Sequence, residues 1–488
     1  MLKGEICIKI KIKFINMKIE QIYTGCLAQG AYYIISDGEA VIIDPLRETK
    51  PYLDRLEKDK ATLKYIFETH FHADFVSGHV DLSKKTGAPI VYGPTATPEF
   101  EAIIAEDNQV FEIGKIKIKV LHTPGHTLES SSFLLMDEDG KEKALFSGDT
   151  LFLGDVGRPD LAQKAADMTQ EKLAGLLYDS LYQKILPLDD DIVVYPAHGA
   201  GSACGKNMQK ETLDSLGNQK RTNYALNQKD KESFIQAVTE GLLPPPAYFG
   251  MNVTMNKKGY ESFDEVLSNS KQALSPDEFE EMVESSGALV LDVRNNNEFA
   301  KGFVPQSVNI GLDGDFAPWI GALIGDIQQP IVLVTDENKE EAITRLSRVG
   351  FDHVLGFLKG GFEAWKNSGK EIDSVHRISA KQFEDESKAK TVKIIDVRKE
   401  SEYKAEHVDK AYNKPLAYIN EWMTHLDPKE HFYLHCAGGY RSMMAASILQ
   451  ARGYRNFTEI EGGFNAIAQT DVPKSDFVCQ TKVFPYIS

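Results

Sequence analysis

The segment T-H-F-H-A-D-F, residues 69–75, directly follows the apolar run L-K-Y-I-F-E. An apolar run of this length, rich in branched and aromatic residues, predicts a buried strand. That strand would end on a loop that carries His70, His72 and Asp74. Because neutral imidazole and carboxylate are the usual protein ligands of zinc and iron, the loop is a candidate metal-binding loop.

The same layout, an apolar run that leads into a loop with His or Asp, recurs downstream. I-K-V-L leads into H-T-P-G-H-T with His122 and His126, A-L-F into S-G-D-T with Asp149, and I-V-V-Y into P-A-H-G with His198. Strands that end on one edge of a sheet bring their loops together, so we expect these side chains to converge. A single histidine is more often a core or surface residue, but this set of motifs favours a metal site.

In this order the motifs resemble those of the metallo-β-lactamase superfamily. T-H-F-H-A-D-F, L-H-T-P-G-H-T and G-D-V-G-R-P-D resemble its persulfide dioxygenase branch, over about residues 17–245. The resemblance implies an αββα sandwich with its site on one edge. It further implies one Fe(II) per chain, held by His70, His126 and Asp149. The remaining site residues would then orient the ligands or persist only as packing: His72, Asp74 and His198.

Phe75 departs from the pattern of the dinuclear zinc hydrolases in this superfamily, which typically read H-x-H-x-D-H. Phenylalanine cannot coordinate a metal, so we expect a single ion. Two imidazoles and one carboxylate leave positions open for substrate and O2, which suits non-haem Fe(II). Arg158 would position an anionic substrate group or form a surface salt bridge. Cys204 would lie near the site entrance or be a buried, inert thiol.

The C-terminal half contains one pattern twice. D-V-R at 292–294 recurs at 396–398, and K-G-G-F recurs as E-G-G-F. A period near one hundred residues is typical of duplicated domains. Short β-branched strands alternate with amphipathic helical stretches, so we expect two small α/β domains with largely parallel sheets, over 275–372 and 376–475.

The second copy contains H-C-A-G-G-Y-R-S between a predicted strand and a predicted helix. At such a turn, backbone N–H groups and the positive helix end favour the thiolate form of Cys436, which is the nucleophile. Gly438 and Gly439 let the loop curl into an anion cradle, and Arg441 adds a fixed positive charge. Cys-dependent phosphatases place this arginine six positions after the cysteine, whereas Arg441 lies five after it. The loop resembles single-domain rhodaneses, which implies a persulfide on Cys436.

The first copy lacks that loop. Its matching segment, I-V-L-V-T-D-E-N-K-E-E-A, has neither cysteine nor glycine and carries the acids Asp336, Glu337, Glu340 and Glu341. With Asp336 taken as the counterpart of the catalytic cysteine, we expect an inactive pseudo-rhodanese that acts as a spacer or docking domain.

The composition restricts the setting of the protein. A net charge of -17 argues against a nucleic-acid or membrane-surface binder. The 5 cysteines include no C-x-x-C pair, which fits a reducing compartment, and no apolar run is long enough for a membrane span, so we expect a cytoplasmic protein. Residues 1–16 alternate Lys with Ile and predict no signal peptide; they are either an edge strand or a stretch upstream of a start at Met17. Pro244–Pro246 and the polar stretch after them predict a linker over 246–274.

The sequence therefore predicts a metallo-β-lactamase-like αββα sandwich followed by two rhodanese-like domains. We expect oxidation of a low-molecular-weight persulfide by O2 to sulfite, and sulfur transfer through Cys436 that gives thiosulfate. A dinuclear zinc thioester hydrolase of the glyoxalase II kind is the first alternative, and Phe75 speaks against it. The second is a non-enzymatic sulfur-sensing scaffold. The sequence leaves open the carrier thiol, the direction of sulfur transfer and homo-oligomerisation.

Overall fold

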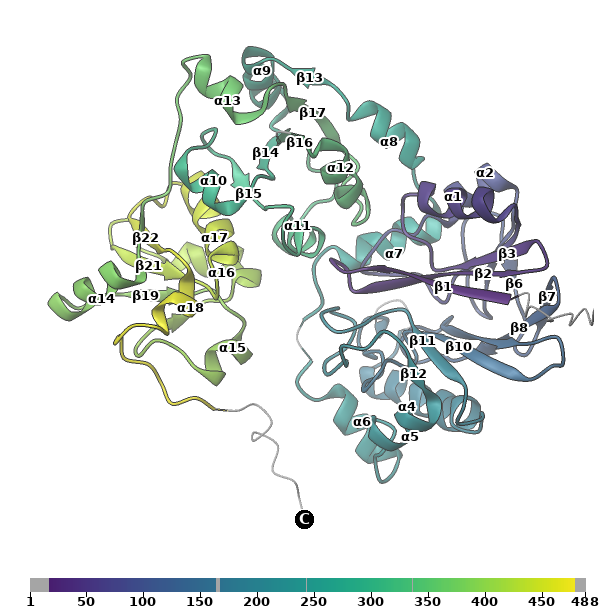
Figure 1. The fold of residues 1–488 in the computed structure, drawn as a ribbon. Coiled ribbons are helices and arrows are strands. Elements are labelled where there is room, and N and C mark those ends of the chain that lie inside the picture. The colour runs from purple at the N-terminus through teal and green to yellow at the C-terminus, as the bar shows by residue number, and fades with distance from the viewer. Residues whose placement is uncertain (1–16, 164–166, 243, 336, 479–488) are drawn as a thin grey trace, which may run out of the picture. The chain divides into compact units, whose positions relative to one another are not determined.

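The computed structural model describes residues 17–163, 167–242, 244–335 and 337–478, which form two compact units (Figure 1). The alternating Lys/Ile stretch at residues 1–16 and Asp336 lie outside the described residues. Among the described residues, no helix combines the length and apolarity that crossing a membrane requires.

The first unit is built on two six-stranded sheets, ordered β1-β2-β3-β4-β5-β6 and β12-β11-β10-β9-β8-β7. The first sheet contains β1 (Met17–Thr24), β2 (Gln29–Ser36), β3 (Glu39–Ile43), β4 (Thr62–Phe67), β5 (Ile90–Tyr92) and β6 (Ile103–Ile104). The second contains β7 (Val110–Ile113), β8 (Ile116–His122), β9 (Ser131–Met136), β10 (Glu142–Gly148), β11 (Val193–Pro196) and β12 (Asp214–Ser215). The helices are α1 (Lys50–Asp59), α2 (His79–Thr86), α4 (Gln170–Ser180) with the π-helical turn η1 (Leu181–Ile185), α5 (Leu216–Thr222) and α6 (Lys231–Thr239).

Side chains that alternate along the strands bind these layers together. In β9, Phe133 and Leu135 belong to the core between the two sheets, whereas Leu134 belongs to the core between the second sheet and its helices. Successive side chains of a strand point to opposite faces, so one strand serves two cores. In Figure 1, α1 and α2 lie outside the first sheet and α4, α5 and α6 outside the second. This arrangement confirms the predicted αββα sandwich.

The range 246–274, predicted as a linker, contains two helices, α7 (Phe249–Lys258) and α8 (Phe263–Asn269). Phe263 and Val266, three residues apart and therefore on one helical face, are both buried in α8. In α7 the buried Asn256 donates hydrogen bonds from Nδ2 to the backbone carbonyls of His72 and Phe75, each at 2.8 Å. The helix thus fixes the backbone between His72 and Phe75.

The second unit carries two five-stranded parallel sheets with the same topology, ordered β13-β17-β16-β14-β15 and β18-β22-β21-β19-β20. The first copy contains β13 (Ala273–Leu274), β14 (Leu289–Asp292), β15 (Val308–Asn309), β16 (Ile331–Val334) and β17 (Val354–Leu358), with α9 (Pro276–Ser286), α10 (Asn296–Lys301), α11 (Phe316–Leu323), α12 (Lys339–Ser347) and α13 (Gly361–Asn367). The second contains β18 (Arg377–Ile378), β19 (Ile394–Asp396), β20 (Tyr412–Asn413), β21 (Phe432–His435) and β22 (Phe457–Ile460), with α14 (Ala380–Ala389), α15 (Glu400–Ala405), η2 (Leu416–Tyr418), α16 (Ile419–Trp422), η3 (Met423–His425), α17 (Tyr440–Ala451) and α18 (Gly463–Ile467). The predicted pair of α/β domains is confirmed.

Strand register corrects the residue that matches Cys436 in the first copy. The backbone N–H of Val293 bonds to the carbonyl of Val334, and that of Val397 bonds to the carbonyl of His435. Because Val293 and Val397 hold the same place in the D-V-R repeat, Val334 corresponds to His435. Thr335 is therefore the counterpart of Cys436, and the choice of Asp336 was wrong by one residue.

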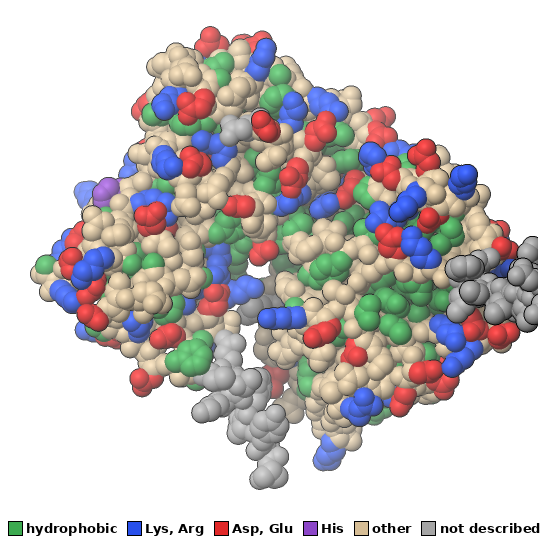
Figure 2. Space-filling model, viewed as in Figure 1, with side chains coloured by type: hydrophobic (Ala, Val, Ile, Leu, Met, Phe, Trp, Pro, Cys, Tyr) green, Lys and Arg blue, Asp and Glu red, His purple; other side chains and the backbone are tan. Residues whose placement is uncertain are grey.

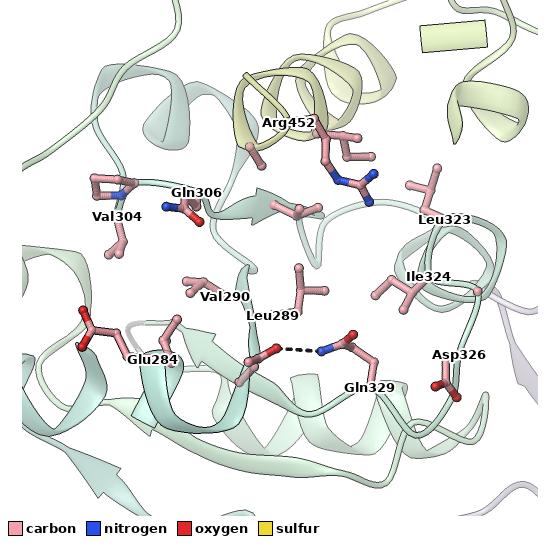
Figure 3. Close-up of a pocket in the computed structure, with 18 of the residues that line it drawn as sticks. Glu284, Leu289, Val290, Val304, Gln306, Leu323, Ile324, Asp326, Gln329 and Arg452 are labelled. Atoms are coloured by element: carbon pink, nitrogen blue, oxygen red, sulfur yellow. Dashed lines mark hydrogen bonds between the residues drawn. The ribbon is translucent and has the colours of Figure 1, made fainter. Parts of the chain in front are cut away.

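A cavity of about 1100 Å³ lies between the two copies (Figure 3). Leu289, Val290 and Ile324 of the first copy contribute apolar walls, and Arg452 reaches it from the second. Arg452 directly follows the C-terminal end of α17, whereas Cys436 precedes its N-terminal end. The cavity and the cysteine loop are therefore different sites.

The repeated D-V-R motif is a structural element. Arg398 donates two hydrogen bonds to Asp396 Oδ2 and one to Oδ1 from its side chain, and its backbone N–H also bonds to Oδ1. The Asp396 side chain is fully buried, and the guanidinium lies 4.0 Å from the ring centroid of Phe464. Asp292 and Arg294 repeat the pair in the first copy.

We expect Asp396→Ala to destabilise the second copy by about 3–5 kcal/mol, because it leaves a buried guanidinium without its counterion. Native-state hydrogen exchange of the β19 and β21 amides in the full chain measures this loss. Glu400→Ala, which removes only an exposed pair with Lys404, is the control and is expected to cost under about 1 kcal/mol. Equal protection in the two variants would contradict the structural role.

Candidate functional site

The predicted ligands His70, His126 and Asp149 lie together at the ends of β4, β8 and β10. Asp149 Oδ2 is 3.8 Å from His70 Nε2 and 3.4 Å from His126 Nε2, and the three residues are at most 2% exposed. Ligand atoms about 2.1 Å from one tetrahedral metal lie about 3.4 Å apart, so the spacing suits one ion. Among the described residues, no group donates a hydrogen bond to the buried Asp149 Oδ2. The donor set therefore fits a metal.

The two imidazoles are oriented from behind. Asp44 accepts hydrogen bonds from Thr69, at Oδ1 from the backbone N–H and at Oδ2 from the hydroxyl, each at 2.8 Å. The hydroxyl of Thr69, having donated its proton, accepts from His70 Nδ1 at 3.0 Å. His126 Nδ1 donates to the carbonyl of Arg158 at 3.0 Å. Both rings therefore present an unprotonated Nε2 to the ligand position.

His198, at the end of β11, fixes the carboxylate of Asp149. Its Nδ1 donates to Asp149 Oδ1 at 2.8 Å, and both side chains are fully buried. Burial alone would raise the pKa of Asp149, but His198, His126 and His70 together hold this pKa well below its usual range. The carboxylate thus stays charged, with Oδ1 bound to His198 and Oδ2 directed at the two imidazoles.

The other candidates on the His70 loop are buried. His72 is fully buried, and its ring centroid lies 4.3 Å from that of Phe75, which is also fully buried. Asp74 is 5% exposed. Phe75 therefore occupies a packed position that offers no ligand atom, as its chemistry predicts.

Arg158 is engaged within the protein. Its Nε and NH2 donate to the two carboxylate oxygens of Asp160 at 2.7 and 2.6 Å, and NH1 donates to the carbonyl of Ala203 at 3.2 Å. The structure thus places the guanidinium in a largely buried salt bridge with Asp160 rather than in one at the surface. Cys204 is buried, and its backbone carbonyl accepts from the N–H of Arg158. Its ligand atom lies within 4.8 Å of one from His198.

The predicted nucleophile Cys436 lies at the turn between β21 and α17 and is 1% exposed. Its Sγ accepts hydrogen bonds from the backbone N–H of Gly439 at 3.1 Å and from the Ser442 hydroxyl at 3.4 Å. Gly439 has a backbone φ of +106°, a value that residues other than glycine rarely adopt. A Cβ added at Gly438 would lie 3.8 Å from Asn465 Nδ2, and no other heavy atom of the described residues beyond its chain neighbours lies within 4 Å. The loop is therefore open at this position. Both hydrogen bonds stabilise a thiolate.

Arg441 does not act as an isolated charge. NH1 and NH2 donate to the two carboxylate oxygens of Glu402 at 2.6 and 2.8 Å. Burial would raise the pKa of Glu402, but the guanidinium holds it below its usual value. An incoming anion would therefore meet a guanidinium whose charge is partly neutralised.

Several functional residues were not identified from sequence. Asp44 follows the apolar run A-V-I-I, so the strand-end pattern that found Asp149 extends to it. Gly157 gave no signal: a Cβ there would lie 1.9 Å from the Asp149 carbonyl and 3.1 Å from His126 Nδ1. Ser442 is the last residue of the quoted H-C-A-G-G-Y-R-S segment but was given no role, and Glu402 follows no motif that marks it as a partner of the cysteine loop.

Comparison with known proteins gives matches along most of the chain. Residues 24–198 match the family model described as Metallo-beta-lactamase superfamily, and residues 275–368 and 379–470 match the Rhodanese-like domain. The chain is 36% identical over 171 residues to a hydroxyacylglutathione hydrolase from Tolumonas auensis, which is 34% of this chain but only 60% of that protein.

Two solved structures are similar over most of their own length. A metallo-beta-lactamase from Staphylococcus aureus subsp. aureus COL is 31% identical with a TM-score of 0.62, covering 70% of this chain and 99% of that one. ETHE1 from Myxococcus xanthus is 28% identical with a TM-score of 0.43, covering 49% of this chain and 98% of that one. The chain therefore belongs to the metallo-beta-lactamase superfamily of metal enzymes, and two rhodanese-like domains follow its metallo-beta-lactamase domain.

Proposed function

We propose that the protein oxidises a low-molecular-weight persulfide with O2 at a single Fe(II) and transfers sulfane sulfur through Cys436. The observation that carries the proposal is the division of the Asp149 carboxylate, which gives Oδ1 to His198 and only Oδ2 to the ligand position. Phe75 offers no ligand for a second metal. Iron(II) would supply open coordination positions for the persulfide and O2 and a reversible redox change, while the persulfide sulfur provides the electrons that reduce O2.

The residues of the first site would hold the reaction in a water-poor environment. His70, His126 and Asp149 would bind the metal, and the hydrogen bonds from Thr69 and Arg158 would keep both imidazoles neutral on their ligand side. The overall reaction is R–S–SH + O2 + H2O → R–SH + SO3²⁻ + 2 H⁺. We also propose that the protein acts in the cytoplasm and that a small thiol carries the persulfide.

The second site would use the thiolate of Cys436. It attacks the sulfane sulfur of a persulfide, so R–S–SH + Cys436–S⁻ → R–S⁻ + Cys436–S–SH. Sulfite then takes the outer sulfur, which gives S2O3²⁻, a proton and the thiolate of Cys436. The N–H of Gly439 and the hydroxyl of Ser442 stabilise the sulfur anion before and after each transfer.

A thioester hydrolase with two zinc ions is the second candidate. It is favoured by the name of the Tolumonas auensis relative, a hydroxyacylglutathione hydrolase. His198 and Cys204, whose ligand atoms lie within 4.8 Å of one another, would be the residues to contribute to a second ion. Metal stoichiometry separates the candidates.

We expect protein purified without oxygen to bind about one iron per chain and to consume O2 with a persulfide substrate. His126→Ala is expected to lower that rate at least about 100-fold, because ligand loss is costlier than loss of the groups that orient ligands. His122→Ala is the matched control, since His122 in the same motif bonds to the carbonyl of Leu128. Two zincs per chain with thioesterase activity, or normal O2 uptake by His126→Ala, would contradict the proposal.

We expect Cys436→Ser to keep O2 uptake within about twofold and to release sulfite in place of thiosulfate. Serine keeps the size, but its hydroxyl stays protonated near neutral pH and cannot form the persulfide. The measurement is the sulfite-to-thiosulfate ratio after thiol derivatisation and chromatography. Cys26→Ser, which alters a half-buried cysteine of the first domain, is the control. Unchanged thiosulfate from Cys436→Ser would remove the rhodanese-like domain from the reaction.

A further inference from the structure

The inactive copy contacts the cysteine loop of the active one. The hydroxyl of Tyr440 donates to the carbonyl of Gly311 at 2.7 Å, and a Cβ on Gly314 would lie 2.4 Å from the Tyr440 ring. Deeper along α17, the Ser447 hydroxyl accepts from the backbone N–H of Asn309 at 2.9 Å. The first copy thus supports the helix that begins at the loop.

A chain of hydrogen bonds leads from the first copy to the thiol. Arg377 NH1 donates to Asn297 Oδ1 at 2.9 Å, and Arg377 Nε donates to Glu459 Oε2 at 2.7 Å. The Ser442 hydroxyl is 2.7 Å from Glu459 Oε1 and 3.4 Å from Cys436 Sγ. The Glu459 side chain is fully buried, although its carboxylate would ordinarily be exposed.

The first copy has a different residue at the positions that match Arg377, Glu459, Ser442 and Cys436. Register places Phe357 at the position of Glu459, because Phe357 pairs with Leu333 as Glu459 pairs with Leu434. Ala273 stands in place of Arg377 by its pairing with Phe357. The helices α12 and α17 start at equivalent positions, so Glu341 replaces Ser442. The network and the nucleophile therefore occur together in the second copy, which points to a shared role.

We propose that Glu459 and Arg377 are positioning residues that set the ionisation of Cys436 through Ser442, and that the inactive copy holds Arg377 through Asn297. The inference rests on the proposed sulfur transfer at Cys436. The single proton of the Ser442 hydroxyl can point to Glu459 Oε1 or to Cys436 Sγ. Ionisation of the thiol, Cys436–SH → Cys436–S⁻ + H⁺, turns this proton from the carboxylate to the sulfur, so a charged Glu459 opposes the ionisation and a charged Arg377 beside Glu459 favours it.

The other charged groups around the thiol are compensated locally. Burial raises the pKa of Glu459 and lowers that of His435, which keeps the His435 imidazole neutral. Glu461 lies 3.8 Å from Arg377 NH1 and is 62% exposed, so water screens it. The remaining charges near the loop form ion pairs with each other: Arg441 with Glu402, and Arg398 with Asp396. Glu459 and Arg377 are thus the charges whose removal acts on the thiol through Ser442.

The test is the pH dependence of Cys436 alkylation by iodoacetamide in the full chain, followed on the Cys436 peptide by mass spectrometry. Glu459→Gln removes a like charge and is expected to lower the apparent thiol pKa by about one unit, whereas Arg377→Gln is expected to raise it by about one unit. Asn297→Ala, at an exposed side chain that folding tolerates, is expected to raise it by about half that amount. Glu298→Gln, on the same helix and paired with Lys301, is the charge control.

Opposite shifts from Glu459→Gln and Arg377→Gln support the inference, because loosening of the fold would move both in one direction. No shift, or shifts of the same sign, would overturn it. If the thiol pKa shifts as expected but the protein has no sulfurtransferase activity, the result contradicts the proposed function and not this inference. If the protein has sulfurtransferase activity but the variants leave the thiol pKa unchanged, the result contradicts this inference and not the proposed function.

Discussion

The carboxylate of Asp149 is a negative charge held almost entirely out of water, and the edge of the sandwich is arranged around it. Removing a carboxylate from water costs several kcal/mol unless partners compensate it. His198, His70 and His126 approach it from three different strand ends. A cation at Oδ2 would complete the compensation, so metal binding and the stability of this edge are coupled.

In the second unit, the residues that stabilise the sheets differ from those of the cysteine loop. Both copies keep the buried D-V-R ion pair and the same strand order, so each can build its sheet. Only the second copy keeps glycines and a cysteine between strand and helix, where Thr335 and its neighbours stand in the first. The cores of the two copies are built alike although the loops differ, so the core does not depend on the residues of that loop. The first copy contacts the helix α17 of the second through Gly311 and Asn309.

The cluster of candidate metal ligands could be predicted from the sequence because each of them follows an apolar strand, and strand ends of a layered fold meet at one edge. The duplicated domains could be predicted because D-V-R and G-G-F recur at a fixed spacing. The match of Thr335 to Cys436 could not be predicted, because strand pairing and not local composition decides which residue matches the cysteine. The contacts of Glu402 and Glu459 with the loop could not be predicted either. Each residue reaches the loop from a separate element and resembles an ordinary surface acid in the sequence. Gly157 is required only by a close backbone approach, which no sequence pattern marks.

The proposed function gives a reason for the two chemistries to share a chain. Adding both steps gives 2 R–S–SH + O2 + H2O → 2 R–SH + S2O3²⁻ + 2 H⁺, in which the product of the first site is the acceptor at the second. Sulfite is a nucleophile that cleaves disulfides, whereas thiosulfate is far less reactive. Fusion fixes the two sites at equal numbers. The slower site then determines whether sulfite escapes, so the residues that hold the Cys436 loop bear on the product as well as on the rate.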